Sequence, residues 1–93
     1  MLYSVHIQHE AQQDIQDAYD WYEKQLPNLG ERFLNDFYSM LDKISNHPEY
    51  YGFAFDDFRD AGLKNFPYLI VFKIMGNKVY INSVRHKKRK PKL

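Results

Sequence analysis

The strongest constraint on the fold is an almost unbroken apolar run from Pro67 to Ile74. A run of this length is typical of a β-strand, and its lack of polar alternation indicates a central strand with both faces covered. Proline fits only at the start of such a strand, because it has no N–H to donate to a neighbouring strand. Met75-Gly76-Asn77 then predicts a tight turn into a last strand, from Lys78 to His86. The rest of the chain must therefore supply apolar faces that pack against a sheet.

Two amphipathic segments precede this strand and supply such faces. The first, over about His9–Gln25, has apolar residues at helical spacing along one side, and the second, over about Asn28–Ser45, has a similar stripe. Pro27 and Gly30 mark a short turn between them, which predicts an antiparallel helical hairpin. Before the hairpin, the alternating segment Leu2–Ile7 predicts a first strand.

The region between the hairpin and the apolar run is less regular. Residues 49–55 hold four aromatic side chains and predict a packed loop, and we expect a short strand with Arg59 over residues 56–61. The element order is then β-α-α-β-β-β. It predicts an α+β fold: a three- or four-stranded antiparallel sheet with the N-terminal helical hairpin packed on one face.

The last strand contains an irregularity in its apolar pattern. Val79 and Ile81 share one face, but Val84 is out of phase with them. A one-residue bulge near Asn82-Ser83 would restore the phase, and bulges often turn side chains toward functional sites. We therefore predict a bulge at this position.

The charge of the chain is divided between its two ends. Residues 1–62 carry four basic and twelve acidic residues, and residues 63–93 carry nine basic residues and no acidic one. Six of the nine lie in the segment 85–93, which starts at the end of the last strand. A local excess of positive charge favours an anionic partner, and phosphate contacts dominate the binding of nucleic acids. The overall charge of +1 hides this division.

Length and composition limit the protein class. Ninety-three residues indicate one domain, spanning residues 1–93 with a basic tail over 85–93. The chain has no cysteine, which excludes a disulfide framework and a thiolate nucleophile. It has no apolar run long enough to span a membrane and no signal-peptide pattern at its start. We expect a cytoplasmic protein that does not associate with membranes, with no metal and no cofactor.

With these elements in place, the chain resembles the RelE/ParE superfamily of toxins from type II toxin–antitoxin systems. The resemblance is strongest to the ParE-like branch, often described as plasmid stabilisation proteins, and it spans almost the whole chain. The segments that carry it are Ala18–Glu23, Leu29–Phe33, Asn46–Pro48 with Tyr50-Tyr51, Phe58-Arg59, Phe66–Phe72 and Val84–Pro91.

The resemblance implies a small growth-inhibiting protein that is neutralised by a cognate antitoxin encoded beside it. It also implies a possible heterotetramer of toxin and antitoxin. Members of the superfamily either cleave mRNA on the ribosome or inhibit DNA gyrase, and both activities use the same fold. A third alternative is a non-toxic module that has the fold and still binds the antitoxin.

Cleavage of mRNA by this family uses the ribose 2′-hydroxyl, so the protein must move a proton and stabilise charge on the phosphate. Arg59 matches the family position of a phosphate-binding arginine. Histidine is the side chain that can move protons near neutral pH, and His86 forms the predicted catalytic set with Arg59 and Arg85. The predicted phosphate-binding residues are Lys64, Lys87, Lys88, Arg89 and Lys90.

Each of these residues also has a structural alternative. Arg59 could form an ion pair with Asp56, Asp57 or Asp60, and His86 could form a hydrogen bond that only supports the end of the strand. The basic tail could be a solvated chain end.

The sequence departs from the nuclease pattern in two ways. No tyrosine follows Tyr80, although ribosome-dependent nucleases of the family often have one in the C-terminal segment, and no acidic residue follows Asp60. The basic cluster around His86 still favours a ribosome-dependent mRNA endoribonuclease over a gyrase inhibitor. We keep both as predictions.

Overall fold

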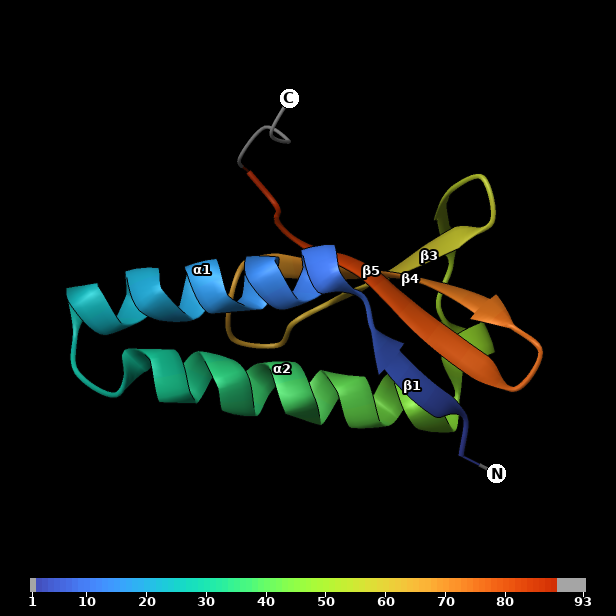
Figure 1. Ribbon diagram of the computed structural model, residues 1–93, viewed down its shortest axis with the longest axis horizontal. Helices are drawn as coiled ribbons and strands as arrows, with labels where there is room; N and C mark the ends of the chain where they lie inside the picture. Colours follow the sequence, from blue (N-terminus) through green and yellow to red (C-terminus); the bar gives the residue numbers. More distant parts are fainter. Residues whose placement is uncertain (1, 89–93) are drawn as a thin grey trace.

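The computed structural model describes residues 2–88 (Figure 1). One strand precedes two long helices, and a short 3-10 turn and four further strands follow. The helical part consists of α1 (His9–Gln25), α2 (Leu29–Asn46) and the turn η1 (Pro48–Tyr50). The strands are β1 (Ser4–Ile7), β2 (Phe53–Phe55), β3 (Phe58–Gly62), β4 (Tyr68–Met75) and β5 (Lys78–His86). The predicted α+β class, with a helical hairpin after the first strand, is confirmed.

The turn between α1 and α2 is held by one side chain. Asn28 adopts a left-handed backbone conformation with φ of 72°, which asparagine tolerates better than most residues. The carboxylate of Glu23 accepts hydrogen bonds from the backbone N–H groups of Asn28, at 3.3 Å, and Gly30, at 2.7 Å. These N–H groups lie at the start of α2, where a helix leaves its donors unpaired. Glu23 therefore caps α2 from the preceding helix.

The sheet has five strands in the order β1-β5-β4-β3-β2. Strand β4 is central, as predicted, and pairs antiparallel with both β3 and β5. The predicted sheet was antiparallel throughout, and this is wrong for β1, which pairs parallel with β5 so that Ser4 lies opposite Lys78. The helical hairpin and η1 join β1 to β2 at the opposite edge of the sheet, and β3, β4 and β5 then bring the chain back to β1. The connection between the two parallel strands is therefore long, as parallel pairing requires.

The aromatic segment 49–55 is partly regular, whereas the sequence predicted only a packed loop. It contains most of η1 and the edge strand β2, whose three residues are all exposed. The short strand expected over residues 56–61 lies at Phe58–Gly62, because Asp56 turns the chain with φ of 47°. The sheet thus gains a fifth strand at the edge opposite β1.

The predicted bulge in β5 is present. Val71 pairs with Ser83 and the next residue of β4, Phe72, pairs with Ile81, so Asn82 is the additional residue. The bulge brings Val84 back to the face that carries Ile81. The carboxylate of Asp14, on α1, accepts a hydrogen bond of 2.9 Å from the N–H of Val84. The helix therefore fixes the strand just beyond the bulge.

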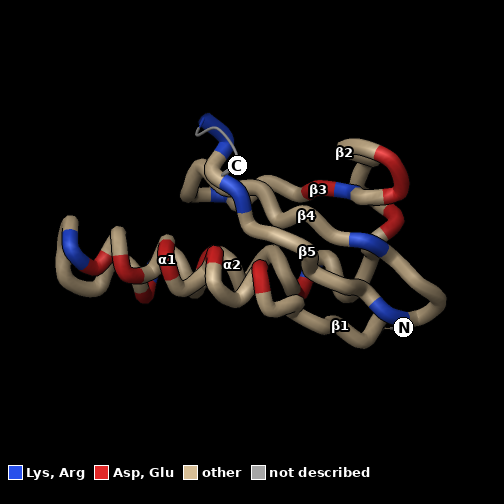
Figure 2. Tube along the Cα trace, turned by 45° about the horizontal axis from the view of Figure 1, so that its top comes forward, with Lys and Arg blue, Asp and Glu red and all other residues tan. Residues whose placement is uncertain are grey.

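Both helices lie on the same face of the sheet (Figures 1 and 2). Between them and β4 lies a cluster of aromatic rings, in which Phe33 contacts Tyr22, Phe66 and Tyr68 with ring centroids 5.3 to 5.6 Å apart. Burial of such rings dominates the stability of a small domain. No helix within residues 2–88 covers the other face, yet Val71 on that face is only 2% exposed. The centre of β4 is therefore buried on both sides without a second helical layer.

Candidate functional site at the basic end of the sheet

The last residues of β5 carry the predicted histidine and its neighbouring arginine. His86 pairs with Tyr68 and Arg85 with Leu69, across β4. Because adjacent residues of a strand point to opposite faces, His86 lies on the helix side and Arg85 on the open side. The His86 ring packs edge-on against Tyr68, with the centroids 5.1 Å apart. The two residues that were predicted to act together therefore point in different directions.

His86 also makes a local hydrogen bond. The backbone N–H of Lys88 donates to its Nδ1 at 3.1 Å, so this nitrogen serves as an acceptor within the chain. The ring is half-buried against the end of the sheet. The geometry matches the structural alternative for this residue, a hydrogen bond that supports the strand end.

The cations at the end of β5 and directly after it are open to solvent. Arg85, Lys87 and Lys88 are all exposed. The backbone N–H of Lys87 donates to the carbonyl oxygen of Pro67 at 2.8 Å, which holds the start of the basic tail beside the loop that leads into β4. Arg89 and Lys90 lie outside the described residues. Figure 2 shows basic residues at this end of the sheet and acidic residues along α1.

Arg59 lies elsewhere on the sheet and its guanidinium is engaged. Its Nη1 donates to the carbonyl oxygens of Tyr51, at 2.6 Å, and Glu49, at 3.3 Å. The guanidinium also packs on the ring of Phe53, 4.1 Å from the centroid. Arg59 thus holds η1 and β2 against β3. The ion pair considered for this region is made instead by Lys73, whose Nζ is 3.2 Å from Asp57.

The distance between Arg59 and His86 bears on the predicted catalytic set. Arg59 lies opposite Phe72 and His86 opposite Tyr68, on the two strands that flank β4. Four positions along the strand and two strand spacings separate their backbones by roughly 16 Å. The fold therefore does not bring the three predicted catalytic residues to one point.

Tyr51, beside Arg59, is another candidate for proton transfer in this region. Burial raises the pKa of its phenol above the usual value, and the neighbouring Tyr50 adds to the shift. Its hydroxyl group lies 3.6 Å from the sulfur of Met40. A phenol with a raised pKa stays protonated at neutral pH, so Tyr51 is unsuited to act as a base.

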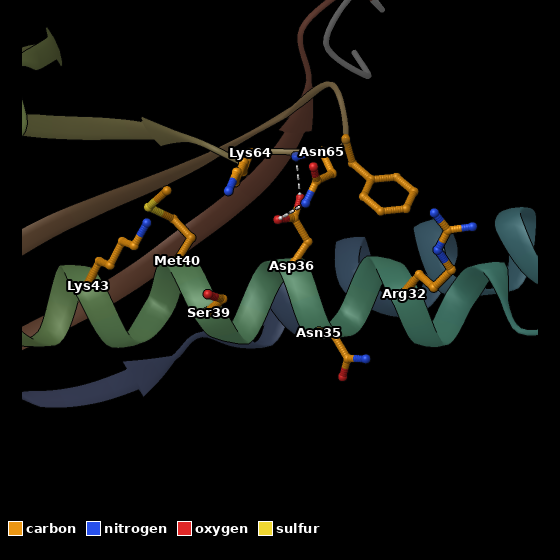
Figure 3. A pocket seen from close by; sticks show the side chains of 9 residues that line it. Arg32, Asn35, Asp36, Ser39, Met40, Lys43, Lys64 and Asn65 are labelled. Atoms are coloured by element: carbon orange, nitrogen blue, oxygen red, sulfur yellow. Dashed lines mark hydrogen bonds between the residues drawn. The ribbon is translucent and has the colours of Figure 1, made fainter.

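Lys64 belongs to a different group of cations from the one that the sequence suggested. It lines a cleft between α2 and the β3–β4 loop, together with Arg32 and Lys43 of α2 (Figure 3). From the sequence, Lys64 was predicted to bind phosphate with the basic C-terminal region, and Arg32 and Lys43 were not predicted as site residues. Arg32 and Lys43 are eleven residues apart, which is about three turns of helix, so they lie on the same side of α2. This spacing could have been used to predict them as a pair from the sequence.

The arrangement as a whole suits the binding of anions. Exposed cations lie at the end of β5 and along the nearby cleft, while the arginine most expected to contact phosphate is engaged in backbone contacts. Such a surface attracts a negatively charged partner at long range. None of the helices within residues 2–88 is long and apolar enough to cross a membrane.

Comparison with known proteins identifies the family. The family model that matches describes the ParE toxin of the type II toxin–antitoxin system parDE, and the match spans residues 5–91. The chain belongs to the ParE toxin family. The resemblance noted from the sequence is therefore confirmed, and ParE membership places the chain among the toxins of type II toxin–antitoxin systems.

A solved structure supports the ParE fold. The chain is similar to one described as a chromosomal ParDE toxin–antitoxin system from P. aeruginosa, with a TM-score of 0.81 and 16% sequence identity. The alignment covers 91% of this chain and 96% of the other. A search of curated protein sequences finds no match. At this level of identity the structural match establishes the shared fold and leaves the target to be argued from the residues.

Proposed function

We propose that this ParE-family chain is a cytoplasmic toxin that inhibits DNA gyrase by binding to it, and that a cognate antitoxin neutralises it. The observation that carries the proposal is the separation of Arg59 from His86. General acid–base catalysis needs its groups within hydrogen-bond reach of one substrate. An inhibitor that acts by binding needs only an exposed, complementary surface, and the end of β5 offers one.

Family membership also favours gyrase over the ribosome as the target. The resemblance from the sequence was to the ParE-like branch, and the matching family model is that of ParE. Cleavage of mRNA on the ribosome, which the sequence analysis favoured, becomes the second candidate. The exposed cations beside His86 support it, since they could neutralise an RNA phosphate.

Membership of the ParE toxin family supports an antitoxin as the partner of this chain. A negatively charged segment of the antitoxin would neutralise the exposed cations of β5 on binding, and an extended segment could also pair with a free sheet edge. Toxin and antitoxin would then assemble as a heterotetramer. Light scattering on the co-purified complex measures its mass directly.

The first experiment separates the two targets. The toxin is expressed from an inducible promoter without antitoxin, and purified toxin is added to gyrase with relaxed plasmid and ATP. Loss of supercoiling, with intact mRNA 5′ ends in the arrested cells, is the expected result. New mRNA 5′ ends within translated codons, with normal supercoiling, would replace the proposal with ribosome-dependent cleavage. Coexpression of the protein encoded by the adjacent reading frame should restore growth in either case.

The predicted catalytic residues give a second test. If the toxin acts by binding, His86→Ala should retain gyrase inhibition as long as the strand end stays folded. If the toxin cleaves RNA through His86, the same substitution should abolish the breaks without a change in the thermal midpoint. Lys24→Ala, which removes an exposed cation near the turn of the hairpin, serves as the control in both assays.

A further inference from the structure

The cleft between α2 and the β3–β4 loop has the form of a binding site. It has a volume of about 380 Å³ and is open to solvent along the side of α2. Three exposed cations line it: Arg32 and Lys43 on the helix, and Lys64 on the loop. Figure 3 shows Arg32 and Lys43 toward the two ends of the helix segment and Lys64 on the opposite wall, between them.

The wall that carries Lys64 is fixed to α2 by a buried carboxylate. Asp36, which is 8% exposed, accepts hydrogen bonds from the backbone N–H of Asn65, at 2.8 Å, and from its side-chain Nδ2, at 3.2 Å. Both oxygens of Asp36 are thus used within the fold, which reduces its ability to compete for the nearby cations. The position of Lys64 relative to α2 is set before any partner arrives, which lowers the entropic cost of binding.

The dimensions of the cleft fit a short piece of polypeptide. Arg32 and Lys43 lie about 16 Å apart along the helix axis, which corresponds to roughly five residues of extended chain. Met40 and Phe66 supply apolar surface between the cations. In a segment that alternates acidic and apolar side chains, the acidic ones could pair with the cations and the apolar ones could pack on Met40 and Phe66.

We infer that this cleft binds an acidic segment of the antitoxin, as a second contact besides the end of β5. The inference rests on the proposed antitoxin partnership. The β3–β4 loop links the two basic surfaces, because it carries Lys64 and its Pro67 carbonyl oxygen accepts a hydrogen bond from the N–H of Lys87. An antitoxin chain that covers the end of β5 can cross this loop and enter the cleft.

The surroundings favour a peptide over a nucleic acid. Residues 1–62, which form both helices, carry twelve acidic and four basic residues. A nucleic acid would bring further phosphates beyond the cleft, where the acidic helices would repel them. A polypeptide needs negative charge only opposite the three cations and can present neutral or basic residues to the rest of the hairpin.

The test uses the whole toxin and the protein encoded by the adjacent reading frame. Each of three single substitutions should raise the dissociation constant by about tenfold or more: Arg32→Glu, Lys43→Glu and Lys64→Glu. Each places a negative charge opposite the negative segment of the antitoxin. Lys24→Glu changes the net charge equally but lies outside the cleft, and it should leave the dissociation constant within about twofold. Circular dichroism of each variant checks that it is folded.

The outcomes separate this inference from the proposed function. If the wild type binds the adjacent protein and the three cleft variants bind it equally well, the cleft is not a contact, although the toxin–antitoxin pairing stands. If the wild type does not bind, the pairing fails and this inference fails with it. If Lys24→Glu weakens binding as much as the cleft variants, the effect is one of net charge, and the inference is overturned.

A second measurement tests the chemical class of the ligand. The isotope-labelled toxin is titrated with a synthetic peptide of alternating glutamate and leucine, and separately with a short single-stranded RNA. The peptide should shift the backbone amide signals of Lys64 and Asn65, and Lys64→Glu should abolish the shift. RNA that shifts these signals more strongly than the peptide would assign the cleft to nucleic acid and overturn the inference.

Discussion

The acidic helical hairpin and the basic end of the sheet use their charges differently. Three carboxylates of the hairpin accept hydrogen bonds from backbone N–H groups far away in the chain or at a helix start: Asp14 from Val84, Glu23 from Gly30 and Asp36 from Asn65. Hydrogen bonds to charged groups are stronger than neutral ones. Three of the eight acidic residues of the hairpin therefore help to hold the fold together.

The basic end contributes little to the fold by comparison. Within residues 2–88 the single ion pair is that of Lys73 with Asp57, near the far end of the sheet. Arg85, Lys87 and Lys88 are exposed, and the backbone N–H groups of the two lysines donate to Pro67 and His86. The division of charge along the sequence thus separates residues that serve stability from residues left for a partner. Substitutions in the two regions should separate stability from activity.

The largest loss of stability is expected at the centre of the hairpin side. Phe33 is fully buried and contacts three other rings, so Phe33→Ala should lower the free energy of unfolding by about 3–5 kcal/mol. Urea denaturation monitored by circular dichroism measures the change. Tyr38→Ala, on the same helix but 54% exposed, is the control and should cost far less. Similar losses for the two variants would mean that the ring cluster is not the core.

The next effect concerns the buried carboxylate that joins α2 to the β3–β4 loop. Asp36→Ala removes the carboxylate that accepts the hydrogen bond from the Asn65 N–H, and a hydrogen bond to a charged group contributes about 1.5–3 kcal/mol. Asp42→Ala removes an exposed carboxylate from the same helix and should change stability by less than about 0.5 kcal/mol. Equal effects would show that the acidic residues of the hairpin act only through net charge, and the comparison between the two regions would fail.

A smaller effect is expected where the two helices meet. A Cβ at Gly30 would lie 2.7 Å from Cγ of Glu23 and 2.8 Å from Cδ1 of Tyr19. Gly30→Ala should therefore push Glu23 away from the start of α2, with an overpacking cost of about 1–3 kcal/mol that outweighs the gain in helix propensity of up to about 1 kcal/mol. Gly52→Ala, where no atom lies within 4 Å, should not destabilise the protein in the same thermal unfolding experiment.

The local elements could be predicted from the sequence because their signals are local. The bounds of α1 and β5 agree with the prediction, and the phase of Val84 located the bulge. The parallel pairing of Ser4 with Lys78 could not be predicted, since it joins residues far apart in the sequence and depends on how the hairpin crosses the sheet. The edge strand β2 is exposed on both sides, so it lacks the alternation that indicates a strand.

The candidate site was harder to predict for the same reason. Arg59 is held by two backbone carbonyl groups, and no residue type or spacing in the sequence encodes a carbonyl partner. The likeness to a phosphate-binding position therefore suggested a role that its contacts do not favour. The cleft could not be predicted because Lys64 is brought over α2 by the contact between Asp36 and Asn65, and these two residues are far apart in the sequence.

The smallest effect on stability is expected at the basic end. There, the loss of toxicity should be large although the free energy of unfolding hardly changes. The triple variant Arg85→Ala, Lys87→Ala, Lys88→Ala removes three exposed charges, and each should change the free energy of unfolding by less than about 0.5 kcal/mol. Growth arrest on induction should nevertheless be lost, because these cations are the accessible part of the proposed target surface. A control variant, Lys24→Ala with Lys78→Ala, removes two exposed cations at other ends of the molecule and should stay toxic. A triple variant that is fully toxic would show that the cations serve neither target, and one that unfolds would show that the basic end, like the hairpin, is part of what holds the fold together.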